Sequence, residues 1–308
     1  MNYKSLIGSI CKSSSLTTIR NLSERNLKDI NLPLSRRDKF LVGLYLILND
    51  YAEGRFPPTF VDQQKTYDGE NNYIYSLPGV TANKALDSLM QKPFWFGNLG
   101  RKYLADFIRL MGVLEKLSIH PPKRLLELGC GTGWIAEFLS LMNFEVVATS
   151  ISGVEIERAR TRINSISIKG INPHLIFMEA KMESINHAVQ GMDQFDAIYV
   201  YEALHHAYDW RKSIVSSFDC LKPGGWLLLC NEPGFLHTYI SYRIGRISNT
   251  HEIGFRRSEI VKHLITTGFY KVINLGNIID LGIRPHWIAA QKRGGQLNSI
   301  LIDKKISI

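Results

Sequence analysis

Short apolar runs alternate with longer amphipathic stretches between about residue 124 and residue 290. Each apolar run has the length of a buried strand, and each longer stretch has apolar residues at helical spacing. The pattern predicts strands at 124–128, 145–149, 175–178, 197–201, 226–231, 270–275 and 286–290, with helices at 133–142, 154–168 and 258–267. Strands that alternate with helices are typical of a doubly wound α/β domain, so we expect a mostly parallel sheet.

The chain before this pattern predicts helices without strands. Its first 23 residues contain three basic residues, many serines and threonines and no acid, which favours a flexible N-terminal arm and is also the composition of a transit peptide. Amphipathic stretches at 36–53 and 101–117 predict helices, and Arg55-Phe56-Pro57-Pro58 ends the first of them. The predicted division is an arm over 1–30, a mainly helical extension or lid over 31–120, an α/β domain over 121–293 and a tail over 294–308.

The first predicted strand runs into a glycine-rich turn, Gly129-Cys130-Gly131-Thr132-Gly133. Glycines there can adopt positive φ and let the backbone approach a ligand, and the helix that follows offers unpaired N–H groups. The spacing G-x-G-x-G differs from the dinucleotide pattern G-x-G-x-x-G, which argues against a nicotinamide-dependent oxidoreductase. Glu127 before the turn would repel a phosphate but could hold a cationic amino group. The turn therefore indicates a cofactor that carries an amino acid.

At these residues the chain resembles the class I S-adenosylmethionine-dependent methyltransferases, whose first motif has an acid followed by G-x-G-x-G. Two later segments resemble the small-molecule, type 11-like members: Phe195-Asp196 opens a strand that leads to Ala203-Leu204-His205-His206, and Leu221-Lys222-Pro223-Gly224-Gly225 precedes the next strand. The resemblance covers roughly residues 122–292. It implies a Rossmann-like, mostly parallel seven-stranded sheet with an antiparallel last strand, and a methyltransferase that uses S-adenosylmethionine.

The resemblance also implies a set of cofactor-binding residues, in which Glu127 holds the methionine amino group. Members of the family usually have an acid after the second strand for the ribose hydroxyls, whereas this chain has Ser150, a weaker hydrogen-bonding group than a carboxylate. Ser152 and Glu155 predict an S-x-x-E capping box for the next helix. The predicted cofactor-binding residues are Glu127, Gly129, Cys130, Gly131, Thr132, Gly133, Ser150, Ile151, Met182 and Tyr201.

The segment after the third strand allows two alignments with the family. Glu179 keeps the usual acid near the adenine in one, whereas in the other Lys181 replaces it and Met182 packs on the adenine. We favour the second alignment, with a solvated loop as the alternative. The loss of one or two acids leaves open a non-catalytic relative that acts as a scaffold or partner subunit. By resemblance, Phe94 to Phe96 could form part of a lid over the cofactor, although such aromatic residues more often pack.

Candidate catalytic residues follow the fourth and fifth strands, at the sheet edge where ligands bind in open α/β folds. They are His205, His206 and Glu232, and a histidine here could act as a general base for a hydroxyl acceptor, although a capped loop histidine is the alternative. His251 and Glu252 could face the same cleft. Because no regular ligand spacing such as H-E-x-x-H is present, we predict no metal.

Composition limits the kinds of molecule that the chain is expected to bind. The formal net charge is +9, but the basic residues are dispersed and no nucleic-acid-binding module accompanies them. Arg243, Arg246, Arg256 and Arg257 fall beside the expected acceptor cleft, so we expect a small or glycan-like, anionic acceptor rather than RNA or DNA. No apolar run reaches the ~20 residues of a membrane span. Four cysteines without C-x-x-C favour the cytoplasm, or an organelle if the N-terminus is a transit peptide; the oligomeric state is not indicated.

Overall fold

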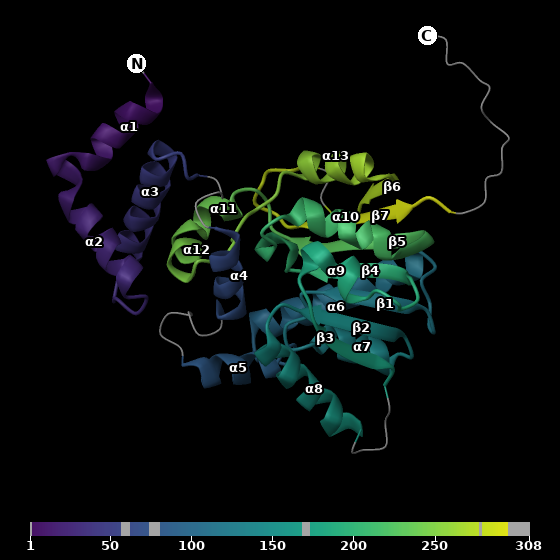
Figure 1. The fold of residues 1–308 in the computed structure, drawn as a ribbon. Helices are drawn as coiled ribbons and strands as arrows, with labels where there is room; N and C mark the ends of the chain where they lie inside the picture. The colour runs from purple at the N-terminus through teal and green to yellow at the C-terminus, as the bar shows by residue number, and fades with distance from the viewer. Residues whose placement is uncertain (1, 57–61, 74–80, 168–172, 277–278, 295–308) are drawn as a thin grey trace, which may run out of the picture.

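A single mixed sheet forms the centre of the protein. The computed structural model describes residues 2–56, 62–73, 81–167, 173–276 and 279–294, which Figure 1 shows as a ribbon. The strands are β1 (Arg124–Leu128), β2 (Glu145–Ser150), β3 (Leu175–Glu179), β4 (Phe195–Tyr201), β5 (Leu221–Glu232), β6 (Phe269–Asn274) and β7 (His286–Lys292). Their order is β3-β2-β1-β4-β5-β7-β6, and β7 runs antiparallel to both of its neighbours. The predicted seven-stranded, mostly parallel sheet with an antiparallel last strand is confirmed.

The central strands are apolar on both faces because helices cover both faces. Leu125 and Leu126 are both fully buried, yet successive side chains point to opposite sides, so each belongs to a different apolar cluster. The first cluster lies under α6 (Asn98–Lys116), α7 (Trp134–Leu141) and α8 (Gly153–Ser167). The second lies under α9 (Ile185–Ala188), α10 (Trp210–Cys220) and α13 (Arg257–Thr267). The two layers of helices hold the carboxyl ends of the strands in fixed positions.

The glycine pair before the fifth strand forms a bulge within that strand, not a separate turn. Phe195 pairs with Leu221 and Ala197 pairs with Trp226, so the residues between Leu221 and Trp226 loop out of the ladder. Gly224 lies in this loop with a φ of +83°, a conformation that glycine adopts without strain. The predicted boundary of the strand was therefore too late by several residues.

Helices also form the N-terminal part, and Figure 1 shows α1, α2 and α3 beside α11 and α12, away from the sheet. The bounds of the remaining helices, with those of the short 3₁₀ helices, are α1 (Tyr3–Lys12), η1 (Ser14–Leu16), α2 (Thr17–Lys28), α3 (Arg36–Ala52), α4 (Gln63–Asn71), α5 (Ala82–Met90), η3 (Met182–Ser184), η4 (Leu204–His206), α11 (His237–Ile240) and α12 (Tyr242–Ser248). The flexible arm expected over 1–30 is wrong, because α1 and α2 pack against α3 and bury Cys11. The predicted tail beyond residue 294 and the Pro57-Pro58 break lie outside the described residues.

A buried carboxylate joins the N-terminal helices to the insertion after β5. Asp50 of α3 is fully buried and accepts hydrogen bonds from Tyr242 Oη and Arg246 Nε, both at 2.7 Å. Arg55 lies 3.0 Å from its other oxygen, and Arg243 donates to Asn26 Oδ1 of α2 at 2.9 Å. These contacts fix α3 and α12 against each other.

Two further observations concern membrane spans and cysteines. None of the helices in the described ranges combines the length and the apolar character needed to span a bilayer. All four cysteines are buried free thiols.

Candidate active site

A cavity of about 260 Å³ opens at the carboxyl ends of β1, β2 and β4. This is the edge at which open α/β sheets bind ligands. Nine of the ten residues predicted to bind a cofactor line the cavity, namely Glu127, Gly129, Cys130, Gly131, Thr132, Ser150, Ile151, Met182 and Tyr201. Gly133 is not among the lining residues. The predicted strand ends and turns therefore meet around one space.

The glycine turn needs glycine at all three positions for different reasons. Gly129, Gly131 and Gly133 all have positive φ, between +54° and +75°. A Cβ on Gly129 would lie 2.5 Å from Cβ of Ala203, and one on Gly133 would lie 2.6 Å from the Phe177 ring. A Cβ on Gly131 would meet no atom within 4 Å, so this residue faces open space. The backbone of Gly131 thus presents a bare surface, on which a ligand can lie where a side chain would be.

Glu127 is the buried acid of this turn, with 3% of its surface exposed. Its Oε2 accepts a hydrogen bond from Tyr199 Oη at 3.0 Å. Burial raises the pKa of Glu127 to about 8, although the hydrogen bonds from Tyr199 and from the Ala136 amide work against this rise. A cation placed beside this carboxyl would stabilise its ionised form. The site therefore fits an ammonium group, as expected for an amino-acid-bearing cofactor.

An acid also stands at the end of β2, where the sequence suggested only a serine. Ser150 Oγ donates to Glu155 Oε2 at 2.9 Å, and both residues line the cavity. The predicted capping box is wrong: Ser152 Oγ donates to Asn71 O at 3.4 Å, and its amide donates to Ser150 Oγ at 3.2 Å. The S-x-x-E spacing was the signal for Glu155, but it indicated a helix cap because that interaction is local. Glu155 instead turns into the cavity.

The loop after β3 lines the cavity with the residues named in the second of the two alignments. Ala180, Lys181, Met182 and Glu183 line the cavity, whereas Glu179 does not. The Lys181 ammonium lies 3.8 Å from the centre of the Tyr67 ring, a cation–π contact. Met182 reaches the glycine turn, since a Cβ on Gly129 would lie 2.7 Å from its Cε. An apolar side chain thus takes one wall of the cavity.

The cover of the cavity comes from residues within the N-terminal extension, 31–120. Phe94 and Phe96 are exposed and do not line the cavity, so they form no lid over it. Trp95 between them packs edge-on against Tyr103 of α6. The cavity is covered instead by residues of α4 and of the segments after α4 and near the end of α5, namely Tyr67, Glu70, Tyr73, Leu89 and Lys92. The mixed polar sequence of α4 gave no pattern that could have identified it as a cover.

Of the three predicted catalytic residues, only His206 lines the cavity. Glu232 is fully buried and accepts hydrogen bonds from the amides of Ala203, Leu204 and His205, at 3.0 to 3.2 Å. Its Oε2 also lies 3.1 Å from His205 Nδ1. Glu232 therefore fixes η4 and orients the His205 ring from behind the cavity wall.

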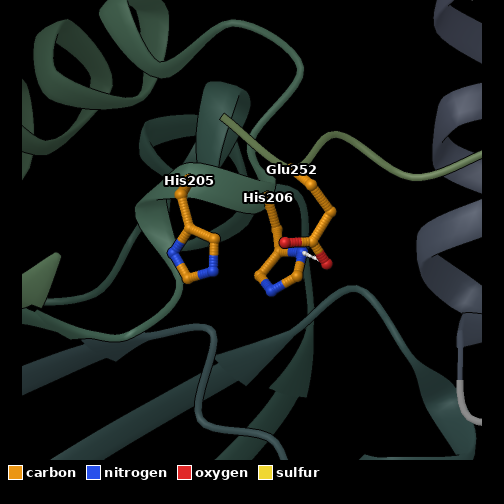
Figure 2. Close-up of side chains that lie close together, drawn as sticks. All are labelled: His205, His206 and Glu252. Atoms are coloured by element: carbon orange, nitrogen blue, oxygen red, sulfur yellow. Dashed lines mark ion pairs between the residues drawn. The ribbon is translucent and has the colours of Figure 1, made fainter. Parts of the chain in front are cut away.

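His206 stands among carboxylates. Its Nδ1 lies 3.1 Å from Glu70 Oε2 and 3.9 Å from Glu252 Oε1. Figure 2 shows the imidazoles of His205 and His206 side by side, with Glu252 reaching over the second ring. Burial alone would lower the pKa of His206, but Glu70 and Glu252 raise it to about 10. The part of the cavity around His206 is thus polar and strongly charged.

The arginines expected beside the acceptor cleft do not line this cavity. Arg243 and Arg246 bind the N-terminal helices, and Arg257 is not among the lining residues. Arg256 lines a second cavity of about 300 Å³, together with His251. The physical basis for expecting an anionic acceptor is therefore removed.

A family model of the methyltransferase domain matches residues 98–270, which is more than half of the chain. The chain therefore belongs to the class I S-adenosylmethionine-dependent methyltransferases. This methyltransferase is similar to the ubiquinone biosynthesis O-methyltransferase of Vibrio atlanticus, with 25% identity over 169 residues, 52% of this chain and 68% of the relative. It is also similar to the O-methyltransferase cnsE of Penicillium expansum, with 25% identity over 194 residues, 63% of this chain and 68% of the relative.

Solved structures share the fold of this methyltransferase. The magnesium protoporphyrin IX methyltransferase of Synechocystis, solved with bound S-adenosylmethionine, superposes with a TM-score of 0.50 at 14% identity, covering 74% of this chain and 97% of that chain. The enzyme uses S-adenosylmethionine as its methyl donor. The glycine surface and the buried Glu127 are features into which this cofactor fits.

Proposed function

We propose that this methyltransferase transfers the methyl group of S-adenosylmethionine to an oxygen atom of a small-molecule acceptor that lies beside His206. When bound, the cofactor supplies a methyl group on a positively charged sulfur. Transfer would break the C–S bond, leave its electron pair on the sulfur as a thioether and form the new C–O bond, and the proton of the acceptor hydroxyl would pass to Glu70 or to solvent. Such a reaction requires the protein mainly to align the two reactants and to accommodate that proton.

The observation that carries this proposal is that two chemically different sets of residues line one cavity. Glu127 and the bare backbone of Gly131 suit the amino-acid part of the cofactor, and Glu70 and His206 suit a hydroxyl group. We propose that Glu127 holds the amino group of the cofactor, that Ser150 and Glu155 together take the ribose hydroxyls, and that Met182 packs on the adenine. Glu155 would thereby replace the acid that the family places after the second strand.

The part of the cavity around His206 supports a small, partly aromatic molecule. Tyr73 and the face of Tyr67 that Lys181 does not cover supply flat aromatic surfaces, and His206 and Glu70 supply the polar groups that a hydroxyl could meet. Two curated relatives are named as O-methyltransferases, which supports oxygen as the acceptor atom. We propose His206 as the residue that touches the acceptor, and His205 and Glu232 as positioning residues behind it. A glycan-like or anionic acceptor loses its support because none of the four arginines lines this cavity.

The test is a methyl-transfer assay with purified full-length protein, labelled S-adenosylmethionine and a panel of phenols, catechols and hydroxy acids. We expect label in an O-methyl product for at least one acceptor with wild type, and little with Glu127→Gln. Binding of S-adenosylmethionine without transfer to any oxygen, combined with transfer to an amine, thiol or carbon acceptor, would overturn the choice of oxygen. Failure of wild type to bind the cofactor would favour a non-catalytic scaffold.

A further inference from the structure

We propose that His205, His206 and Glu252 form a binding site for a divalent transition-metal ion at the part of the cavity around His206. One ligand atom from each of these side chains lies within 4.8 Å of the others. Figure 2 shows that both histidines extend from η4 and that Glu252 approaches from the segment before α13. Two imidazoles with one carboxylate are a donor set that suits Zn²⁺ and related ions better than Mg²⁺.

The outer partners of these side chains are those that metal ligands have. A ligating histidine usually donates its second ring N–H to a carboxylate, which fixes the ring and directs its other nitrogen to the metal. Glu232 holds His205 Nδ1 in this way at 3.1 Å, which leaves Nε2 for a metal. Likewise His237 Nε2 lies 3.0 Å from Glu252 Oε2, which leaves Oε1. Both side chains are therefore already oriented from behind.

The position of His206 is unusual for a simple ion pair. Its Nδ1 is buried and makes no hydrogen bond of acceptable geometry, although Glu70 Oε2 is only 3.1 Å away. In an octahedral shell with ligands about 2.1 Å from the metal, neighbouring ligand atoms are about 3.0 Å apart and point at the metal, not at one another. Opposite ligand atoms are about 4.2 Å apart, so the three side chains, whose ligand atoms lie within 4.8 Å of one another, would have to approach by up to about 1.8 Å to share one ion.

Three segments far apart in sequence are fixed around this point. The amide of His251 donates to Glu70 Oε1 at 2.7 Å, and the amide of Ile253 donates to His205 O at 3.3 Å. The cluster also contains three buried carboxylates, of Glu70, Glu232 and Glu252, whose charge a dication would offset. The residues that would bind the ion are thus held in place by the fold and are charged for a cation.

The metal site would add a catalytic ion to the proposed methyl transfer, and this role of the ion rests on the proposed function. His206 lines the cavity, so an open coordination position would face the acceptor. A divalent ion lowers the pKa of a bound hydroxyl and stabilises the oxyanion that attacks the methyl group. The proton released there would pass to solvent or to Glu70 beside the ion. Acceptors with two adjacent oxygens would then be preferred, because both can bind one ion.

The experiment is a calorimetric titration of full-length, EDTA-treated and dialysed protein with Zn²⁺, together with Co²⁺ absorption spectra. We expect one ion per chain, and a loss of affinity of about 100-fold or more in His206→Ala and in Glu252→Gln. Glu232→Gln should lose about 10-fold, because it removes only an outer partner. His187→Ala is the matched control, since His187 is exposed in α9, and it should bind Zn²⁺ like wild type.

Binding of S-adenosylhomocysteine by each variant shows that the variant is folded and separates the two proposals. If wild type binds S-adenosylhomocysteine but binds Zn²⁺ and Co²⁺ no better than a His206→Ala, Glu252→Gln double variant, the metal site is overturned and methyl transfer is unaffected. If the metal binds at this site but no oxygen acceptor is methylated, the proposed function fails and the metal site stands.

Discussion

The binding of S-adenosylmethionine should release about one proton, because of the environment of Glu127. With a pKa of about 8, about one in thirty Glu127 carboxyls is ionised at pH 6.5 in the unliganded protein. An α-amino group, with a pKa of about 7.7 to 8.0, stays protonated at that pH. The cofactor ammonium would stabilise the carboxylate, so the proton leaves on binding. Affinity should therefore rise about tenfold, or about 1.4 kcal/mol, between pH 5.5 and 6.5.

The groups that face Glu127 do not compete with this titration. Burial raises the pKa values of Tyr199, Cys130 and Cys230, so all three are neutral at pH 6.5.

The stability of the unliganded protein should also depend on the titration of Glu127. Since the folded pKa lies above the ordinary value of 4.5, the stability that Glu127 contributes is complete below pH 4.5 and is lost as the pH rises through about 8.

The assay is calorimetry at pH 6.5 in two buffers of different ionisation enthalpy, with EDTA present to keep metal ions out. The difference in apparent enthalpy gives the number of protons released. We expect close to one for wild type and close to zero for Glu127→Gln, which keeps the shape of the side chain. A release near zero in wild type, or an equal release in the variant, would refute the assignment of the amino group to Glu127.

Further predictions test the other parts of the structure. Glu155→Gln should weaken S-adenosylhomocysteine binding about tenfold, and Ser150→Ala should weaken it less, as measured by calorimetry; unchanged affinity in both would remove them from the ribose site. Gly129→Ala should lower the free energy of unfolding by more than 2 kcal/mol in urea titrations, because its Cβ would overlap Ala203, whereas Gly112→Ala, which meets no atom within 4 Å, should be neutral or stabilising. Asp50→Ala should destabilise the protein by about 3–5 kcal/mol, since Arg246 loses the buried carboxylate to which it donates a hydrogen bond. A change below about 1 kcal/mol in the free energy of unfolding would contradict this.

The sheet could be predicted because its signal is local. A strand such as β1, with Leu125 and Leu126 buried on opposite faces, gives a continuous apolar run. The turn that follows is also visible in the sequence, because few other structures need glycine at every second position. The family motifs then placed Glu127 and Met182 on one edge of the sheet. These features depend on neighbouring residues, so the sequence contains the information directly.

The rest depends on contacts between distant segments. Glu155 has the spacing of a helix cap, and only the approach of Ser150 and the cavity shows its other position. The cover by Tyr67 and the cluster of His206 with Glu252 join segments that no periodic pattern connects. Helices α1 and α2 were missed because their composition resembles that of a mobile arm, whereas packing on α3 stabilises them.

A crystal structure of the full-length protein with S-adenosylhomocysteine tests the central claim most directly. The account predicts the ligand in the cavity at the ends of β1, β2 and β4, with its amino group at hydrogen-bond distance from Glu127 and its ribose hydroxyls at Glu155. A ligand bound elsewhere, or bound in this cavity with its amino group away from Glu127, would contradict the account.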